Sequence, residues 1–258
     1  PIAHREVGQI DNLEIARLIE EIAKKAGPNA AKKARDHLRT AISRGFKGAN
    51  PTTGVKPPRA PKRKHRVLTA QEARALLPFI SDTHRDLYAL SLFTGLRPSE
   101  LASMETRDVD AHEGALYVRR SFTREMPKDG DERRVPLAPE ALAIMKRLMK
   151  ASKGGNLWPD AVRRIARGTG LSIPLHRAIR RAVAAGAVPS LSRGFVMKCR
   201  RQGCGYTEHV DKKPKDDLAC PDCDFTLWPS PQIVKVRWYD LRHTTGTLLI
   251  EAGVDAGV

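Results

Sequence analysis

Two short segments place an arginine where its side chain could bind a phosphate. The first is TGLRPSEL, in which Gly95 is typical of a helix end and Pro98 of a first helical turn, with Arg97 between them. The second is YDLRHT, which contains Arg242. A guanidinium is planar, stays charged at any working pH and can donate two parallel hydrogen bonds to phosphate oxygens. Glu100 could orient Arg97 from one turn away, although an arginine that only caps a helix end would show the same pattern.

Four cysteines form a second cluster, with the spacing of a metal site. They lie within 25 residues, and the intervals between them hold four, 15 and two residues: Cys199, Cys204, Cys220 and Cys223. This spacing predicts a tetrahedral zinc site with four thiolate ligands, which leaves no open position for catalysis. Two disulfides are the alternative, but they suit an intracellular protein poorly. His209 could also replace one of the cysteines, although a surface histidine explains it as well.

The charge of the whole chain favours a polyanionic partner. Lys and Arg total 46 against 29 Asp and Glu, a net charge of +17 over 258 residues. A basic surface that only keeps the protein in solution is the alternative. No stretch approaches the roughly 20 apolar residues of a membrane helix, and no signal-peptide pattern opens the chain. We therefore expect a cytoplasmic protein with no membrane partner. Because the chain opens at Pro1 and stops at Val258 without an evident domain end, we also expect a fragment.

The elements that would position these groups begin with two helices, which apolar periodicity predicts within residues 11–45. The second helix carries cations that could lie along a phosphate backbone, or could simply be solvated: Lys32, Lys33, Arg35 and Arg39. Residues 57–67 are rich in proline and positive charge and predict an extended linker. Its basic run could contact DNA or serve only as a tether or localisation tag: Lys62, Arg63 and Lys64.

The rest of the chain predicts a mainly helical layer. Thr69 and Glu72 have the spacing of a capping box, and a second helix should begin at Asp82 or Thr83. ALYVRRSF and ERRVPL read as strands around the turn-forming MPKDGD, which predicts a β-hairpin with Lys128 near its tip. Helices are also predicted over 139–150, 174–186 and 240–252. The expected fold class is α+β, mainly α with a small antiparallel sheet.

In order, spacing and flanking residues, these segments resemble the tyrosine recombinase, or phage integrase, family. TGLRPSEL is similar to the family's first arginine box, PKDGDERRVPL to its lysine hairpin and YDLRHTTGTLLIEAG to its second arginine box. The resemblance covers most of the chain and implies three parts. Residues 1–56 would be a partial, helical, DNA-clamping core-binding domain, 57–67 the linker, and 68–258 an incomplete catalytic domain with a zinc-ribbon-like insert over 198–228.

Carried over by position, the resemblance implies a site-specific DNA recombinase that needs no cofactor for catalysis. Arg97 and Arg242 would hold the scissile phosphate, with Glu100 in support, and Lys128 would protonate the departing 5′ oxygen. In the family, a tyrosine attacks the phosphorus to give a 3′-phosphotyrosyl link. The implied partners are double-stranded DNA, three further copies of the chain in a homotetramer, and accessory DNA-bending proteins. The insert, placed just before the second box, would be an extra DNA contact or a partner surface.

Two features depart from the family pattern. Tyr239 stands where the second box usually has histidine, and a phenol can hydrogen-bond a phosphate but shuttles protons poorly near neutrality. His243 points about 100° around the helix from Arg242, which is more typical of a structural contact. The family's nucleophile lies beyond the second box, where none of the chain's four tyrosines stands. A DNA-binding integrase remnant without chemistry is therefore an alternative, and a zinc-ribbon RNA-binding protein is a third interpretation.

Overall fold

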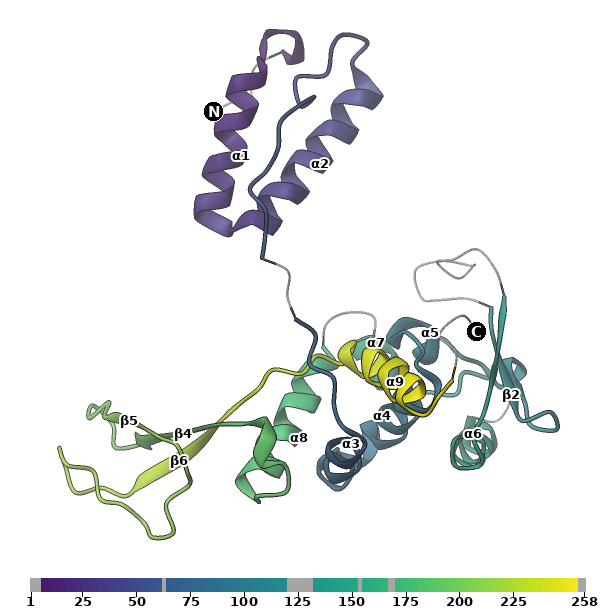
Figure 1. Cartoon of the computed structure of the whole chain (residues 1–258), viewed down its shortest axis with the longest axis vertical. Coiled ribbons are helices and arrows are strands. Elements are labelled where there is room, and N and C mark those ends of the chain that lie inside the picture. The colour runs from purple at the N-terminus through teal and green to yellow at the C-terminus, as the bar shows by residue number, and fades with distance from the viewer. Residues whose placement is uncertain (1–5, 62–63, 120–131, 153–154, 167–169, 255–258) are drawn as a thin grey trace. The chain divides into compact units, whose positions relative to one another are not determined.

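The computed structural model describes residues 6–61, 64–119, 132–152, 155–166 and 170–254 (Figure 1). The chain divides into two compact units, Pro1–Lys64 and His65–Val258. Each unit has its own hydrophobic core, and each is described separately below. No helix among these residues is both long and apolar enough to cross a bilayer.

The first unit is a pair of helices, α1 (Asn12–Ala26) and α2 (Pro28–Gly45), preceded by a short 3-10 turn at Val7–Gln9. Asp11 begins α1 because its carboxylate accepts a hydrogen bond from the Glu14 backbone N–H, while Glu14 reaches back to the Asp11 N–H. Gly27 alone separates the helices, with φ 88°, a conformation that favours glycine. The core between the two helices consists of Ile15, Ile19, Ala31 and Val55.

The second unit is mainly helical, as the sequence predicts, and has two small antiparallel sheets where one was expected. Its first half holds α3 (Ala70–Leu76), α4 (Asp82–Thr94) and α5 (Pro98–Ala102), with 3-10 turns at Leu77–Phe79 and Thr106–Asp108. Strands β1 (Val109–Asp110), β2 (Ala115–Val118) and β3 (Arg133–Pro136) form one sheet in that order. Thr69 and Glu72 make the expected capping box at the start of α3.

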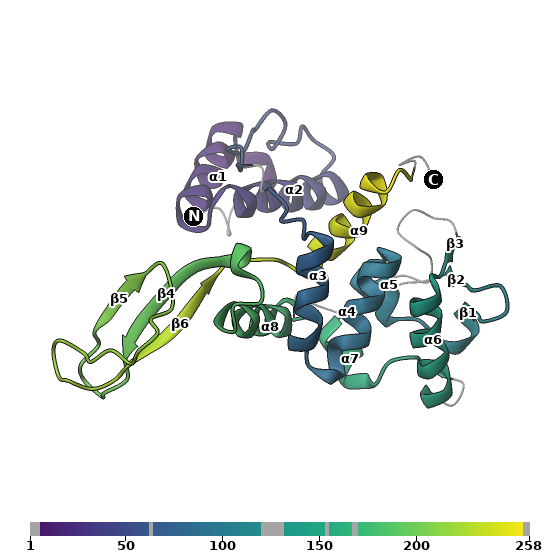
Figure 2. The same cartoon turned by 60° about the horizontal axis from the view of Figure 1, so that its bottom comes forward.

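The second half holds the remaining helices and the larger sheet. The helices are α6 (Pro139–Ser152), α7 (Asp160–Ala166), α8 (Ser172–Ala184) and α9 (Asp240–Glu251), with a 3-10 turn at Pro189–Leu191. Strands β4 (Ser192–Cys199), β5 (Thr207–Val210) and β6 (Leu227–Ile233) pair in the order β5-β4-β6. This sheet extends away from the helices beyond α8, whereas the smaller sheet lies beside α6 (Figures 1 and 2).

The structure differs from the sequence expectations at three places. The second unit begins at His65 rather than at residue 68, so the last residues of the predicted linker belong to it. The cysteine insert is carried by a sheet that spans 192–233, wider than the predicted 198–228, because β4 and β6 continue their pairing toward α8. The sequence did not predict helix α7 or strand β1. Each has seven residues or fewer, which is too short to show a clear periodicity.

Candidate active site

Glu100 is the centre of the charged cluster around the first arginine segment. Its side chain is 1% exposed, and its Oε1 lies 2.7 Å from Arg97 Nη1. Its Oε2 accepts hydrogen bonds from the Arg97 backbone N–H at 2.9 Å and from Arg133 Nη2 at 2.7 Å. One buried carboxylate therefore fixes two guanidinium groups, from the start of α5 and from β3.

Burial raises the pKa of the Glu100 carboxyl, but the hydrogen bonds from Arg97 and the charges of Arg133 and Arg97 outweigh it and leave the pKa below its ordinary value of 4.5. Glu100 is therefore ionised near neutrality. A buried anion of this kind holds a guanidinium in place and offsets the cost of keeping it in a partly dry site.

The second arginine segment lies against the first. Helix α9 packs on α4, and Arg242 Nη1 donates to the carbonyl of Gly95 at 2.6 Å, only two residues before Arg97. Arg242 thus contacts the end of α4, the role that the sequence left open for Arg97, whereas Arg97 is paired with Glu100. Two arginines 145 positions apart in the chain meet at one turn.

The turn at Gly95 makes this approach possible. Gly95 has φ 60°, the left-handed conformation that ends many helices. A Cβ at this position would lie 3.3 Å from Thr245 Cγ2 of α9. Thr245 itself donates to the Leu92 carbonyl at 2.8 Å, and the Trp238 Nε1–H donates to Ser91 Oγ at 2.9 Å. The glycine therefore meets two needs, a positive φ and a close helix–helix contact.

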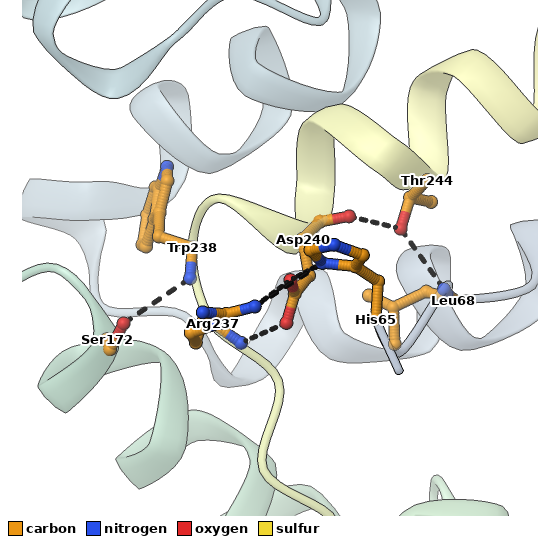
Figure 3. Close-up of polar contacts among 7 residues, drawn as sticks. All are labelled: His65, Leu68, Ser172, Arg237, Trp238, Asp240 and Thr244. Atoms are coloured by element: carbon orange, nitrogen blue, oxygen red, sulfur yellow. Dashed lines mark hydrogen bonds and ion pairs between the residues drawn. The ribbon is translucent and has the colours of Figure 1, made fainter. Parts of the chain in front are cut away.

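The start of α9 carries a cluster of ionisable and aromatic side chains (Figure 3). His65 Nδ1 lies 3.1 Å from Asp240 Oδ1, and Arg237 Nη2 lies 3.3 Å from the same oxygen. The His65 ring also lies on the His243 ring, with centroids 3.9 Å apart. Nearby, the Leu68 backbone N–H donates to Thr244 Oγ1 at 3.1 Å. These contacts attach the segment that enters the second unit to α9.

Tyr239, which departs from the family pattern, touches His243, the predicted supporting residue. Tyr239 is 41% exposed, and its ring meets the His243 ring edge-on with centroids 5.5 Å apart. Burial, followed by the charge of His65, lowers the pKa of His243 below 6.5, with the Asp240 carboxylate opposing the shift. His243 therefore favours the neutral form near neutrality, in keeping with a packing role.

Sequence reasoning missed Arg133 and His65. Arg133 opens ERRVPL, and its placement at the start of a strand next to the lysine hairpin was the only available signal. His65 looked like part of a basic linker. Its partner Asp240 is 175 positions away, and no local pattern links the two.

The remaining predicted site residues are in different environments. Lys128, Lys62 and Arg63 lie outside the described residues. Lys64 is exposed, as are Lys32, Lys33 and Arg39 on α2. Arg35 is mostly buried and pairs with Asp36 at 3.2 Å, so it is less available to a ligand than its neighbours.

The four cysteines converge, and all four Sγ atoms lie within 4.8 Å of one another. Cys199 and Cys223 Sγ are 3.5 Å apart and Cys204 and Cys220 Sγ are 3.6 Å apart, so all four are free thiols. A tetrahedral zinc with bonds of about 2.3 Å needs sulfurs roughly 3.8 Å apart, which this cluster approaches. His209 lies on the other face of the sheet, paired with Val196 of β4, and is not part of the cluster.

The thiols differ in acidity. Burial raises the pKa of Cys199 and of Cys220. The backbone N–H of Phe225 hydrogen-bonds Cys223 and lowers its pKa to about 7. One member of the cluster is thus close to the thiolate form that a metal requires.

The second unit is an α+β domain in which Arg97, Arg133 and Arg242 gather around Glu100 and the Gly95 turn. Residues 66–171 match the phage integrase family. The matched segment contains Arg97, Glu100 and Arg133, while Arg242 follows it. This match, together with the sequence relatives described next, supports a relationship to the tyrosine recombinases.

Similar proteins agree with this assignment. Tyrosine recombinase XerC of Xanthomonas campestris is 27% identical over 159 residues, which cover 58% of this chain and 47% of that protein. The chain thus spans about half the length of the curated relatives it matches. The Tn1549 transposon integrase in complex with transposon right end DNA has a TM-score of 0.56 at 17% identity, covering 97% of this chain and 76% of that one. A lambda integrase dimer bound to a COC′ core site gives a TM-score of 0.56 at 18% identity, with coverages of 96% and 76%. The two structures share the fold.

Proposed function

We propose that this chain forms the phosphate-binding part of a site-specific DNA recombinase that breaks and rejoins double-stranded DNA. The observation that carries the proposal is the meeting of the two arginine segments, through Arg242 and the Gly95 carbonyl, beside an arginine held by a buried carboxylate. The relatives that match the chain carry the names of recombinases and integrases, which supports the same function.

In this proposal Arg97 and Arg242 bind the non-bridging oxygens of the scissile phosphate. Their donors strengthen as negative charge builds on the pentavalent phosphorus, so they lower the barrier without a metal. Glu100 keeps the Arg97 guanidinium in a single orientation, and a fixed donor costs no reorganisation during the reaction. Arg133, held by the same carboxylate, adds positive charge to the site.

Lys128 is the proposed general acid. The family's tyrosine nucleophile would attack the phosphorus, with its phenolic proton passing to solvent water. The bond to the 5′ oxygen would break, and Lys128 would donate a proton to that oxygen. Tyr239 is the proposed phosphate donor in place of the usual histidine, with His243 supporting its ring from one turn along. The reverse steps rejoin the strand, so no external energy source or cofactor is required.

The family relationship extends the proposal to the assembly. The lambda integrase structures are described as a dimer on a core site and a tetramer on a Holliday junction. We propose a homotetramer on two duplexes for the full-length protein, with the exposed cations of α2 along the DNA backbone. Accessory DNA-bending proteins are further candidate partners.

Covalent trapping tests the function. The full-length protein is incubated with a duplex nicked beside the crossover position, so that cleavage releases a short strand and leaves the protein on the DNA. A denaturation-resistant complex is expected for the wild type and none for Arg97→Ala, while Arg97→Ala keeps most of its duplex affinity. Arg39→Ala, which removes the same charge from the first unit, should still form the complex. Binding without any covalent complex by the wild type would favour the alternative, a DNA-binding integrase remnant.

We further propose that the four cysteines hold one structural zinc ion. The converging thiols, the free state of all four and the small core around Met197 and Leu227 support this assignment. Metal analysis should find one equivalent of zinc. Cys220→Ser should lower that content and remove amide protection from β5, whereas a Ser99→Ala control should do neither. A metal-free wild type with a fully protected β5 would exclude the site.

A further inference from the structure

The β5-β4-β6 sheet has one face that the zinc cluster does not use. Successive residues of a strand point to opposite faces of the sheet. Met197 and Cys199 of β4 therefore share the inner face with Leu227, next to the thiols. The opposite side, which we name the outer ribbon face, presents Lys198, Arg200, Thr207, His209, Trp228 and Ser230.

The pairing register aligns these residues in rows. Lys198 of β4 stands between Thr207 of β5 and Trp228 of β6. The next row is His209, Val196 and Ser230, with Val196 buried beneath its neighbours. Neither row contains a carboxylate. All polar side chains in the two rows can donate a hydrogen bond. The outer ribbon face therefore suits a ligand that is anionic and rich in acceptors.

Trp228 is a large, exposed apolar side chain on this face. Its side chain is 53% exposed, and the Arg200 guanidinium carbon lies 4.1 Å above its ring. Arg200 therefore lies over one face of the indole, while Lys198 is the cross-strand partner of Trp228. An exposed indole with cations beside it can stack on a nucleobase while the cations hold the adjoining phosphates.

We propose that the outer ribbon face binds single-stranded DNA, with an unpaired base stacked on Trp228 and the flanking phosphates on Lys198 and Arg200. Duplex DNA would engage the two cations but would leave the indole without a partner, because its bases are already stacked on each other. A protein partner would cover Trp228 but would not require a row free of carboxylates. This activity goes beyond the proposed recombinase function, since it uses none of the residues around Glu100.

The tryptophans of the chain make the proposal directly measurable. There are three, and Trp158 and Trp238 are 4% and 3% exposed, so Trp228 is the one that a ligand can reach. Titration of the full-length protein with a short oligothymidine should quench the tryptophan fluorescence to saturation. A duplex of the same length should quench it little. Trp228→Phe should abolish the quenching but keep oligothymidine affinity, measured by the anisotropy of a labelled strand, close to that of the wild type.

Two further variants separate stacking from charge. Trp228→Ala should weaken oligothymidine binding about tenfold, the usual cost of losing one base–aromatic stack. Lys198→Ala with Arg200→Ala should weaken it and reduce the slope of log affinity against log salt by about 1.4. Lys213→Ala with Lys215→Ala removes the same charge from the loop after β5 and should change both quantities less. The zinc content of each variant reports whether the ribbon remains folded.

The proposal is overturned if Trp228→Ala binds oligothymidine like the wild type, or if duplex and single strand quench Trp228 equally. The first result would indicate that Trp228 contacts a protein partner instead of a base. The second would indicate that the outer ribbon face contacts phosphates of any DNA. Covalent trapping of Trp228→Ala on nicked DNA remains an independent measurement. If neither the wild type nor Trp228→Ala forms a covalent complex, the recombinase proposal is wrong. The proposal of single-strand binding would still stand.

Discussion

Glu100 connects the charged groups of the candidate site. Its two carboxylate oxygens are divided between Arg97 and Arg133, and one of them also accepts the N–H that opens α5. A buried carboxylate with three donors is stabilising only while all of them are present. The residue links an arginine of the first box to the strand that follows the lysine hairpin, so a change at Glu100 should affect stability and function together.

Glu100→Gln tests this at the level of stability. The amide keeps the shape but removes the negative charge that pairs with two partly buried guanidinium groups, so we expect a loss of about 3 kcal/mol in the free energy of unfolding. Urea denaturation measures it. Glu132→Gln is the matched control, because Glu132 pairs with Arg119 at 3.1 Å in an exposed position and should cost less than about 1 kcal/mol. Equal costs for the two variants would contradict the central role of Glu100.

His243 predicts a fall in stability on mild acidification. Burial lowers the pKa of His243 in the folded state below 6.5. Burial also lowers the pKa of His84 below 6.5. Between the folded pKa and the unfolded pKa of each histidine, the unfolded chain therefore binds more protons than the folded protein does. Stability from these residues is complete above pH 6.5 and is lost as pH falls through the folded pKa, with a slope of at most about 1.4 kcal/mol per pH unit for each group.

His243→Gln should flatten this pH dependence between pH 7.5 and 5, measured as unfolding free energy from urea titrations at several pH values. The carboxylates Glu100 and Asp240, whose pKa values are lowered, lose their contribution only at more acidic pH and do not interfere. An unaltered slope in His243→Gln would contradict the predicted contribution of His243.

At the scale of elements, the contact between α4 and α9 assembles the site. Trp238, Arg242 and Thr245 of the α9 segment all bond to the last turn of α4 or the glycine that ends it. The ribbon strands, by contrast, have a small core of their own around Met197, Cys220 and Leu227. The position of the arginines thus depends on helix packing, while the ribbon depends on its cysteines.

Gly95→Ala measures that helix contact. The left-handed φ alone costs about 1 kcal/mol for a residue with a Cβ, and the new methyl would also press on Thr245 Cγ2 at 3.3 Å. Gly186→Ala is the matched control, since Gly186 has φ 74° with open space around its Cβ position. We expect Gly95→Ala to destabilise the protein more than Gly186→Ala in thermal unfolding. Thr245→Ser, which removes the crowded methyl, should recover part of the difference, and no recovery would show that the contact is not limiting.

At the scale of the whole molecule, the chain is two units with separate cores. The first unit buries only a few apolar side chains between α1 and α2, whereas the second has a large continuous core. Small cores give low stability, because little apolar surface leaves water. The two units should therefore unfold in separate transitions, the first unit at the lower temperature.

Ile19→Ala and Leu116→Ala test this independence. Both side chains are fully buried, in the first and second cores respectively, and each truncation should cost about 2 to 5 kcal/mol. Calorimetry should show Ile19→Ala lowering only the first transition and Leu116→Ala only the second. A single transition that both substitutions lower would mean that the units fold as one.

Local sequence determined much of this protein. The helix pair of residues 11–45, the capping box at Thr69 and the strands around MPKDGD all follow from periodicity and turn chemistry that act over a few residues. The cysteine spacing predicted a cluster of thiols for the same reason, since each pair is fixed by its own turn. The arginine segments could be found because Gly95 and Pro98 mark a turn.

Only the tertiary structure decided which groups meet. The Arg242 contact with Gly95, the place of Arg133 on Glu100 and the attachment of His65 to Asp240 join residues 33 to 175 positions apart. No local rule specifies such pairs, because they depend on how α4, α9 and β3 pack together. The sequence therefore identified the two arginines and their carboxylate. Packing of the second unit's core determined that Arg242 reaches the turn before Arg97, and the strand register of the ribbon determined which residues share a face with Trp228.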